Sequence, residues 1–258
     1  MSLADRLGSD AEARWLTQLA PPDRLEELVE RRLSGEPLQY VLGAWAFRNL
    51  ELTVDQRALI PRPETEQVVE VALGLLGDRP HPVVVDLGTG SGAIALCIAL
   101  ERPGAEVWAT DLDPAAIELA TANRKRTGAT AELCQGSWYE ALPPRLLGRV
   151  DLVVSNPPYV SEREWPTLDE EVRREPRQAL VAGDGSDGTP GLADVEAVLS
   201  GAARWLVPGG AVVVELAPHQ ALAGAALARR AGLVGVGLAR DLAGRERAVT
   251  ARSAQASG

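Results

Sequence analysis

From Pro82 onward, short apolar runs alternate with longer amphipathic segments, and turn residues separate them. Short runs rich in Val and Leu are typical of buried strands, whereas the longer segments have the apolar spacing of helices. Repeated alternation of this kind predicts an α/β fold with a mostly parallel sheet covered by helices. The expected strands are Val83–Val85, Glu106–Ala109, Ala131–Cys134, Val150–Val154, Ala211–Leu216, Leu233–Leu238 and Arg247–Ala251, and the expected helices are Ala93–Leu100, Pro114–Arg126, Ala193–Leu206 and Pro218–Arg230.

The chain before Pro82 has a different pattern. Between Asp10 and Ser34 the apolar residues have helical spacing in two segments, which Pro21-Pro22-Asp23 separates, with Asp23 as the expected N-cap of the second. Trp45–Thr53 alternates as a short hairpin would, and Glu64–Leu76 is an expected helix. We therefore predict an N-terminal helical region (1–43), a hairpin linker (44–60) and the sheet domain (61–258).

Composition restricts the class of protein. With 258 residues, 46% of them hydrophobic, the chain can bury one sizeable core. Its only cysteines are Cys97 and Cys134, which excludes a disulfide scaffold and a cysteine-ligated zinc site. The net charge of −10 disfavours a protein that holds long duplex nucleic acid, because phosphate contacts require a positive surface. Without a signal-peptide pattern or a run of about 18 apolar residues, we expect a soluble, cytoplasmic, monomeric protein that does not contact membranes.

A glycine-rich turn follows the first strand of the sheet domain. Gly88-Thr89-Gly90-Ser91-Gly92 connects that strand to a helix, so its backbone can approach a ligand closely and its amides can face polar groups. The spacing of Gly88, Gly90 and Ala93 also satisfies the dinucleotide fingerprint. A carboxylate at Asp86 would repel pyrophosphate, but it suits the cationic amino acid end of S-adenosylmethionine.

Two further strand ends carry candidate cofactor contacts. Asp111 comes at the end of the next strand, where a carboxylate can accept hydrogen bonds from ribose hydroxyls in either cofactor class. Asp113 precedes Pro114 and is the expected N-cap of the following helix. Trp138 follows the third strand, where it either covers an adenine face or packs in the core.

The fourth strand ends abruptly at Asn156-Pro157-Pro158-Tyr159. The prolines have no N–H, so the carbonyls of Asn156 and Pro157 have no donor beside them. Together with the side-chain oxygen of Asn156, these carbonyls can hold an NH₂ group, and Tyr159 can flank a planar substrate. The segment predicts a grip for a planar amino or amide nitrogen.

Other polar residues give weaker signals. His81 and His219 have no metal-ligand spacing, and we predict no metal site. Glu215 ends an apolar strand near the predicted site, but a charge at a strand end requires no special role. The acidic cluster Asp169-Glu170-Glu171 is most simply a solvated face.

The four residues from Asn156 to Tyr159 resemble the catalytic motif of amino-group methyltransferases. Within that class the chain is similar to the bacterial protein-(glutamine-N5) methyltransferases that modify peptide-chain release factors. Further matching segments are Gly35–Pro37, Ile60–Glu66 and Arg174–Leu180, and the resemblance extends from about Arg31 to Thr250. Two features depart from the family. The N-terminal helical region is shorter than the family's bundle, and Ser137 replaces the usual Asp that contacts the adenine amino group.

The resemblance implies a Rossmann-like methyltransferase domain with a seven-stranded, mostly parallel sheet, preceded by a small helical region and a hairpin linker. It also implies S-adenosyl-L-methionine as cofactor, and methyl transfer to the N5 amide nitrogen of the glutamine in the Gly-Gly-Gln motif of a release factor. The expected cofactor-binding residues are Gly88, Thr89, Gly90, Ser91, Gly92, Asp111, Trp138 and Asn156. The expected catalytic residues are Asn156, Pro157 and Tyr159, and the expected substrate-binding residues are these three and Pro158.

Two other functions stay open at this point. A methyltransferase for exocyclic amino groups of nucleic acid bases would use the same grip, although the acidic charge disfavours it. A nicotinamide-dependent oxidoreductase would use the glycine turn, but Asp86 and the motif from Asn156 to Tyr159 disfavour it.

Overall fold

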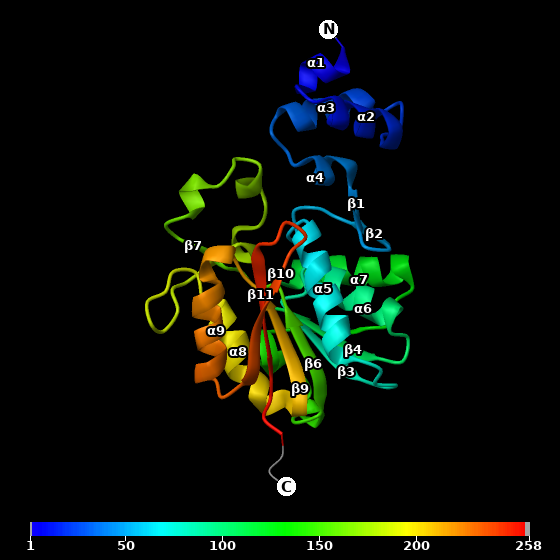
Figure 1. The fold of residues 1–258 in the computed structure, drawn as a ribbon. Helices are drawn as coiled ribbons and strands as arrows, with labels where there is room; N and C mark the ends of the chain where they lie inside the picture. The colour runs from blue at the N-terminus through cyan, green and yellow to red at the C-terminus, as the bar shows by residue number, and fades with distance from the viewer. Residues whose placement is uncertain (1, 256–258) are drawn as a thin grey trace.

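A seven-stranded sheet forms the centre of the molecule in the computed structural model, which describes residues 2–255 (Figure 1). The strand order is β10-β11-β9-β6-β3-β4-β5, and β11 runs antiparallel to both β9 and β10 while the other pairs are parallel. This arrangement confirms the predicted fold class. The strands are β3 (Val83–Leu87), β4 (Glu106–Asp111), β5 (Glu132–Gln135), β6 (Val150–Ser155), β9 (Leu206–Glu215), β10 (Val234–Arg240) and β11 (Glu246–Arg252).

Helices cover both faces of the sheet (Figure 1). Successive strand residues point to opposite faces, so Val84 and Leu152 pack in one apolar cluster while Val85 and Val153 pack in the other. Burial on both faces explains why the central strands are continuous apolar runs. One face carries α5 (Pro63–Leu76), α6 (Ala93–Glu101) and α7 (Pro114–Thr127), and the other carries α8 (Ala193–Trp205) and α9 (Ala221–Arg230).

Some expected boundaries were wrong. Ala211–Leu216 was expected as the fifth strand, but β9 begins at Leu206, directly after α8, because Leu206 already pairs with Val150. The residues between Leu206 and Ala211 form an irregularity in this pairing, where Gly209 has a φ of +75°. The first residues of the expected helix at Pro218 form a 3₁₀ turn, Pro218–Gln220, before α9. Two further 3₁₀ turns, Trp138–Ala141 and Pro144–Leu146, connect β5 to β6.

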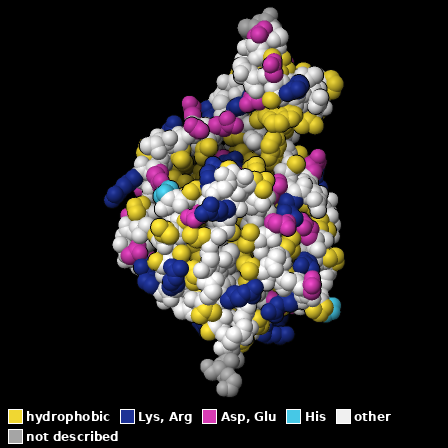
Figure 2. All heavy atoms as spheres, in the orientation of Figure 1, with side chains coloured by type: hydrophobic (Ala, Val, Ile, Leu, Met, Phe, Trp, Pro, Cys, Tyr) yellow, Lys and Arg dark blue, Asp and Glu magenta, His cyan; other side chains and the backbone are white. Residues whose placement is uncertain are grey.

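The N-terminal region forms four short helices, which project from the larger body as a lobe (Figure 2). Asp23 is not the N-cap of the third helix. The Arg24 amide donates to the Pro21 carbonyl at 2.9 Å, which turns the chain first, and the helix begins at Leu25. The helices are α1 (Leu3–Leu7), α2 (Asp10–Leu19), α3 (Leu25–Leu33) and α4 (Leu38–Leu42), and their shared core contains Leu16, Leu28, Val29, Leu38 and Val41.

The predicted hairpin, β1 (Ala44–Phe47) paired with β2 (Leu50–Thr53), connects this lobe to the sheet. At its turn, the Arg48 guanidinium forms ion pairs with Glu101 of α6 at 2.7 Å and Glu70 of α5 at 3.0 Å. The Asn123 side chain of α7 bonds both the N–H and the carbonyl of Thr53. The hairpin is thus fixed to three helices of the sheet domain.

Residues 160–182 form a segment that returns to the start of α5. Its ends pair in parallel as β7 (Val160–Ser161) and β8 (Val181–Ala182), and between them lie the 3₁₀ turns Trp165–Thr167, Val172–Arg174 and Arg177–Ala179. The buried Glu175 carboxylate accepts from the Ile60 amide at 2.9 Å and forms an ion pair with Arg62. Two segments that resembled the family in sequence therefore contact each other directly.

Asp113 is the N-cap of α7, as predicted, because its carboxylate accepts from the Ala115 amide at 2.9 Å. We expect Asp113→Ala to lower the free energy of unfolding by about 1 kcal/mol, since the substitution removes the cap. Asp113→Asn retains a capping oxygen and is the matched control. Urea denaturation monitored by circular dichroism measures both, and equal losses in the two variants would contradict the capping role.

Candidate active site

The carboxyl ends of β3, β4 and β6 meet at one edge of the sheet. Leu87 pairs with Thr110 on one side and with Ser155 on the other, so the loops that follow these strands begin side by side. They surround a cavity of about 480 Å³, within the range of cofactor pockets. Its wall contains Thr65, Gly88, Thr89, Gly90, Ser91, Asp111, Ser137, Trp138, Asn156, Pro158, Pro176, Gln178 and Asp194, among others.

Hydrogen bonds to β4 fix the glycine turn. The amides of Gly88 and Thr89 both donate to the Thr110 carbonyl at 2.9 Å, and the Gly90 amide donates to Asp111 at 2.8 Å. Gly92 lies behind the cavity wall, where its φ is +86° and a Cβ atom would come within 2.9 Å of the Leu96 side chain, so the turn itself requires glycine. The turn therefore presents Gly88 to Ser91 to the cavity.

Asp111 and Trp138 both lie in the cavity wall. The Asp111 carboxylate accepts the Gly90 and Asp113 amides, and burial raises its pKa. Trp138 has a φ of +42°, which is uncommon for a bulky residue, and its indole ring lies against Gly88. The structure thus brings together the predicted ribose contact and the predicted adenine contact beside the glycine turn.

Asp86 is fully buried behind the glycine turn rather than in the cavity wall. Its Oδ2 accepts from the Thr89 hydroxyl at 2.6 Å and from the Ala95 amide at 3.2 Å, whereas Oδ1 has no partner among residues 2–255. Burial raises the pKa of this carboxyl to about 7. The glycine turn therefore separates the Asp86 carboxyl from any ligand in the cavity.

The four residues predicted to hold the substrate NH₂ group, 156–159, do not all line the cavity. Asn156 and Pro158 line the cavity, whereas Pro157 is buried and Tyr159 is outside the wall. The Asn156 Nδ2 donates to the hydroxyl of Thr65 at 3.2 Å. Tyr159 is held by its backbone, because its amide donates to the Leu180 carbonyl and its own carbonyl accepts from Gln220.

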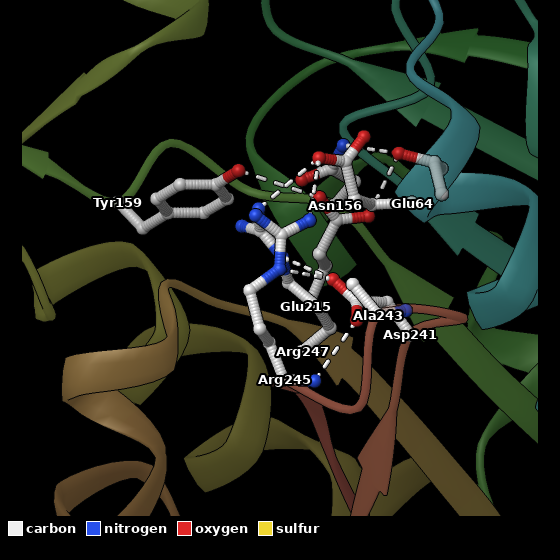
Figure 3. Close-up of polar contacts among 9 residues, drawn as sticks. Glu64, Asn156, Tyr159, Glu215, Asp241, Ala243, Arg245 and Arg247 are labelled. Carbon is white, nitrogen blue, oxygen red and sulfur yellow. Dashed lines mark hydrogen bonds and ion pairs between the residues drawn. The ribbon is translucent and has the colours of Figure 1, made fainter.

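The buried carboxylate of Glu215 connects the Tyr159 hydroxyl with the Thr65 hydroxyl to which Asn156 is bonded. Figure 3 labels Glu215, Tyr159 and Asn156. Glu215, at the end of β9, accepts from the Thr65 hydroxyl at 2.8 Å and from the Tyr159 hydroxyl at 3.3 Å. Burial raises its pKa to about 7, and the nearby Arg247 partly opposes this effect. Sequence reasoning missed the roles of Thr65 and Glu215, although an isolated carboxylate directly after the apolar run Val212–Val214 was a usable signal.

Family models match two parts of the chain. The model described as methyltransferase small domain matches residues 69–184, and the model described as PrmC N-terminal domain matches residues 10–43. Two solved methyltransferases share the fold. One is from Pyrococcus furiosus (TM-score 0.60, 18% identity, 81% of this chain and 91% of that chain). The other is the Thermus thermophilus 16S rRNA N2 G1207 methyltransferase in complex with AdoMet and guanosine (TM-score 0.58, 20% identity, 81% and 49%). Fold and family models together define a methyltransferase.

Curated relatives identify the family. The release factor glutamine methyltransferase of Bordetella pertussis is 47% identical over 221 residues, which cover 86% of this chain and 79% of that protein. The protein of the same name from Deinococcus radiodurans is 41% identical over 251 residues, covering 97% and 83%. The chain belongs to the release factor glutamine methyltransferase family.

Within residues 2–255, no helix has the length and apolar character to span a bilayer.

The raised pKa of Asp86 predicts a pH-dependent stability. A carboxyl whose pKa is higher in the folded than in the unfolded state favours folding below its unfolded pKa, and this contribution is lost as the pH rises through about 7. Asp86→Asn removes the titration, so the wild type should lose on the order of 4 kcal/mol relative to the variant between pH 4 and pH 8. Denaturant unfolding at both pH values measures the difference. Parallel pH dependences in the two proteins would contradict the buried position of this charge.

Proposed function

We propose that this protein transfers a methyl group from S-adenosyl-L-methionine to the N5 side-chain nitrogen of the glutamine in the Gly-Gly-Gln motif of a peptide-chain release factor. The observation that carries the proposal is the position of Asn156 beside the glycine turn in one cavity, within a chain of this family. The turn can hold the cofactor while Asn156 holds the acceptor nitrogen, so donor and acceptor meet at the same edge of the sheet.

The cavity fits this cofactor. Gly88 to Ser91, Asp111 and Trp138 would hold it, since Asp111 has acceptor sites left after its two amide bonds and the Trp138 indole offers a flat apolar surface. The unpartnered Oδ1 of Asp86 behind the turn suits a positively charged ligand in front of it. When bound, S-adenosyl-L-methionine supplies the electrophilic methyl group. The side chain of Gln178 donates a hydrogen bond to Asp113, and both residues lie in the cavity wall.

The residues of the grip act on the acceptor nitrogen. An amide nitrogen is a weak nucleophile because its lone pair is delocalised, so its orientation and its developing positive charge both matter. The Asn156 Nδ2 is bonded to Thr65, which leaves Oδ1 as the side-chain atom that can accept an N–H from the substrate. The Pro157 carbonyl is the predicted acceptor of the second N–H. Tyr159, held by Glu215, supports this turn from behind.

Methylation of exocyclic base amines is the alternative function. It would use the same grip on an NH₂ group, but the net charge of −10 and the family assignment favour the release factor. A methyl-transfer assay with radiolabelled cofactor, offering purified release factor, tRNA, rRNA and DNA in parallel, separates the two. Label in the release factor supports the proposal, and label only in nucleic acid would refute it.

Cofactor binding should depend on Asp111. Asp111→Ala removes a carboxylate that holds the glycine turn and is placed to bond ribose hydroxyls, so it should weaken binding of S-adenosylhomocysteine by about 1.5–3 kcal/mol. Ser9→Ala is the control, because it removes the N-cap of α2, which lies outside the cavity wall. Isothermal calorimetry measures both, with NAD as a ligand that should give no signal. An unchanged affinity in Asp111→Ala would contradict the assignment.

Turnover should depend on Asn156 far more than cofactor binding does. Asn156→Ala should lower kcat by at least about 100-fold, because the grip matters most as charge develops on nitrogen. A release factor with glutamate in place of the motif glutamine should not be methylated, since it has no N–H to hold. Mass spectrometry of the motif peptide reports both outcomes. Substantial methylation by Asn156→Ala would remove this residue from the chemistry.

A further inference from the structure

Three hydrogen-bonding side chains, those of Asn156, Thr65 and Glu215, lead from the cavity into the interior. Figure 3 labels Asn156 and Glu215, the two ends of this series. Asn156 and Thr65 lie in the cavity wall, and Glu215 lies behind them with 1% of its surface exposed. The Asn156 Nδ2 donates to the Thr65 hydroxyl at 3.2 Å, and that hydroxyl donates to the Glu215 Oε2 at 2.8 Å. Asn156 directly follows β6, Thr65 lies in α5 and Glu215 ends β9, so only the folded chain assembles the three residues.

An ionised carboxylate at the inner end fixes the direction of every bond in this chain. Glu215 without a proton can only accept, so the single hydroxyl hydrogen of Thr65 must point toward it. The Thr65 oxygen can then only accept from Asn156, so Asn156 must donate through its NH₂ group. The amide oxygen of Asn156 is left for the cavity.

We propose that Glu215 and Thr65 are positioning residues that select the orientation of the Asn156 amide in which its oxygen, rather than its NH₂ group, meets the acceptor nitrogen. This inference rests on the proposed function. An asparagine amide can rotate by 180°, which exchanges its donor and acceptor ends with almost no change in shape. The rotated amide would present N–H groups to the substrate NH₂, so the grip would be lost although no residue had moved.

Burial raises the pKa of Glu215 to about 7, and its hydrogen bond from Thr65 and the nearby Arg247 oppose this effect, so the carboxyl is ionised above that pH. Thr65 and Glu64 face it from α5, Tyr159 from the loop after β6, and Arg247 from β11. The Arg247 guanidinium favours the charged carboxylate, although it is also bonded to Glu64 at 3.1 Å and to Asp241 at 3.4 Å. Protonation of Glu215 would give it a hydrogen to donate to Thr65. The two hydrogen bonds that join Glu215, Thr65 and Asn156 would then be free to run in the opposite direction.

The test compares variants of Thr65 that keep or remove its hydroxyl. Thr65→Val has the same shape without the hydroxyl, so kcat for the release factor should fall by about 10-fold to 100-fold while the affinity for S-adenosylhomocysteine changes by less than about 3-fold. Thr65→Ser restores the hydroxyl and should recover most of the lost turnover. A Thr65→Val enzyme with wild-type kcat, or a Thr65→Ser enzyme as slow as Thr65→Val, would overturn the proposal.

Glu215→Gln gives an independent measurement in an isosteric variant that buries no charge. Wild-type kcat should rise with pH through about 7 as Glu215 ionises, and this limb should be absent from Glu215→Gln. The profiles are measured at saturating S-adenosyl-L-methionine, so that a change in cofactor affinity from Asp86, which titrates in the same range, does not affect kcat. Persistence of the limb in Glu215→Gln would contradict the role of Glu215.

The same assays separate an incorrect substrate from an incorrect role for Thr65 and Glu215. A wild-type enzyme that methylates no release factor refutes the proposed substrate, and the same variants are then compared on the nucleic acid that accepts the label. A wild-type enzyme that methylates the release factor, together with undiminished Thr65→Val, refutes the positioning role alone.

Discussion

Parallel pairing of β3 with both β4 and β6 is the constraint on which the site depends. Because parallel strands end at the same edge of a sheet, the register that pairs Leu87 with Thr110 and Ser155 brings three loops together. The Thr110 carbonyl then accepts the Gly88 and Thr89 amides, so the backbone of β4 holds the turn that follows β3. A shift of one residue in this register would turn the side chains of the shifted strand to the opposite face of the sheet, and the cavity would not form.

The parts of the site that could be predicted from the sequence are residues with an unusual backbone and residues at or just after the end of a strand, such as Asp111 and Trp138. The glycines after β3 mark positive φ angles, and the two prolines after β6 remove donors wherever they occur. The central strands of the sheet domain were predictable because burial on both faces leaves a continuous apolar run. The helices between them were predictable from their apolar spacing. The short helices α1 and α4 lack enough length to show a period.

The parts that could not be predicted depend on contacts between distant segments. Thr65 and Glu215 are 150 positions apart, and neither has a local pattern that points to the other. Glu175 and Arg62 were recognised only as parts of similar segments, whereas their ion pair explains how Pro176, Gln178 and Ala179 come to border the cavity. Asp86 was expected to face a ligand, but the turn that brings Thr89 to its carboxylate places it behind the wall. In each case the pairing is set by the tertiary fold.

In the proposed reaction, Asn156 presents its amide oxygen to a substrate nitrogen beside the glycine turn. A crystal structure with S-adenosylhomocysteine and a release-factor peptide containing Gly-Gly-Gln tests this most directly. We expect the glutamine NH₂ within hydrogen-bond distance of the Asn156 Oδ1 and the Pro157 carbonyl, with the Asn156 Nδ2 still on Thr65. A peptide whose glutamine lies elsewhere, or which accepts a hydrogen bond from the Asn156 NH₂ group, would contradict this orientation of Asn156.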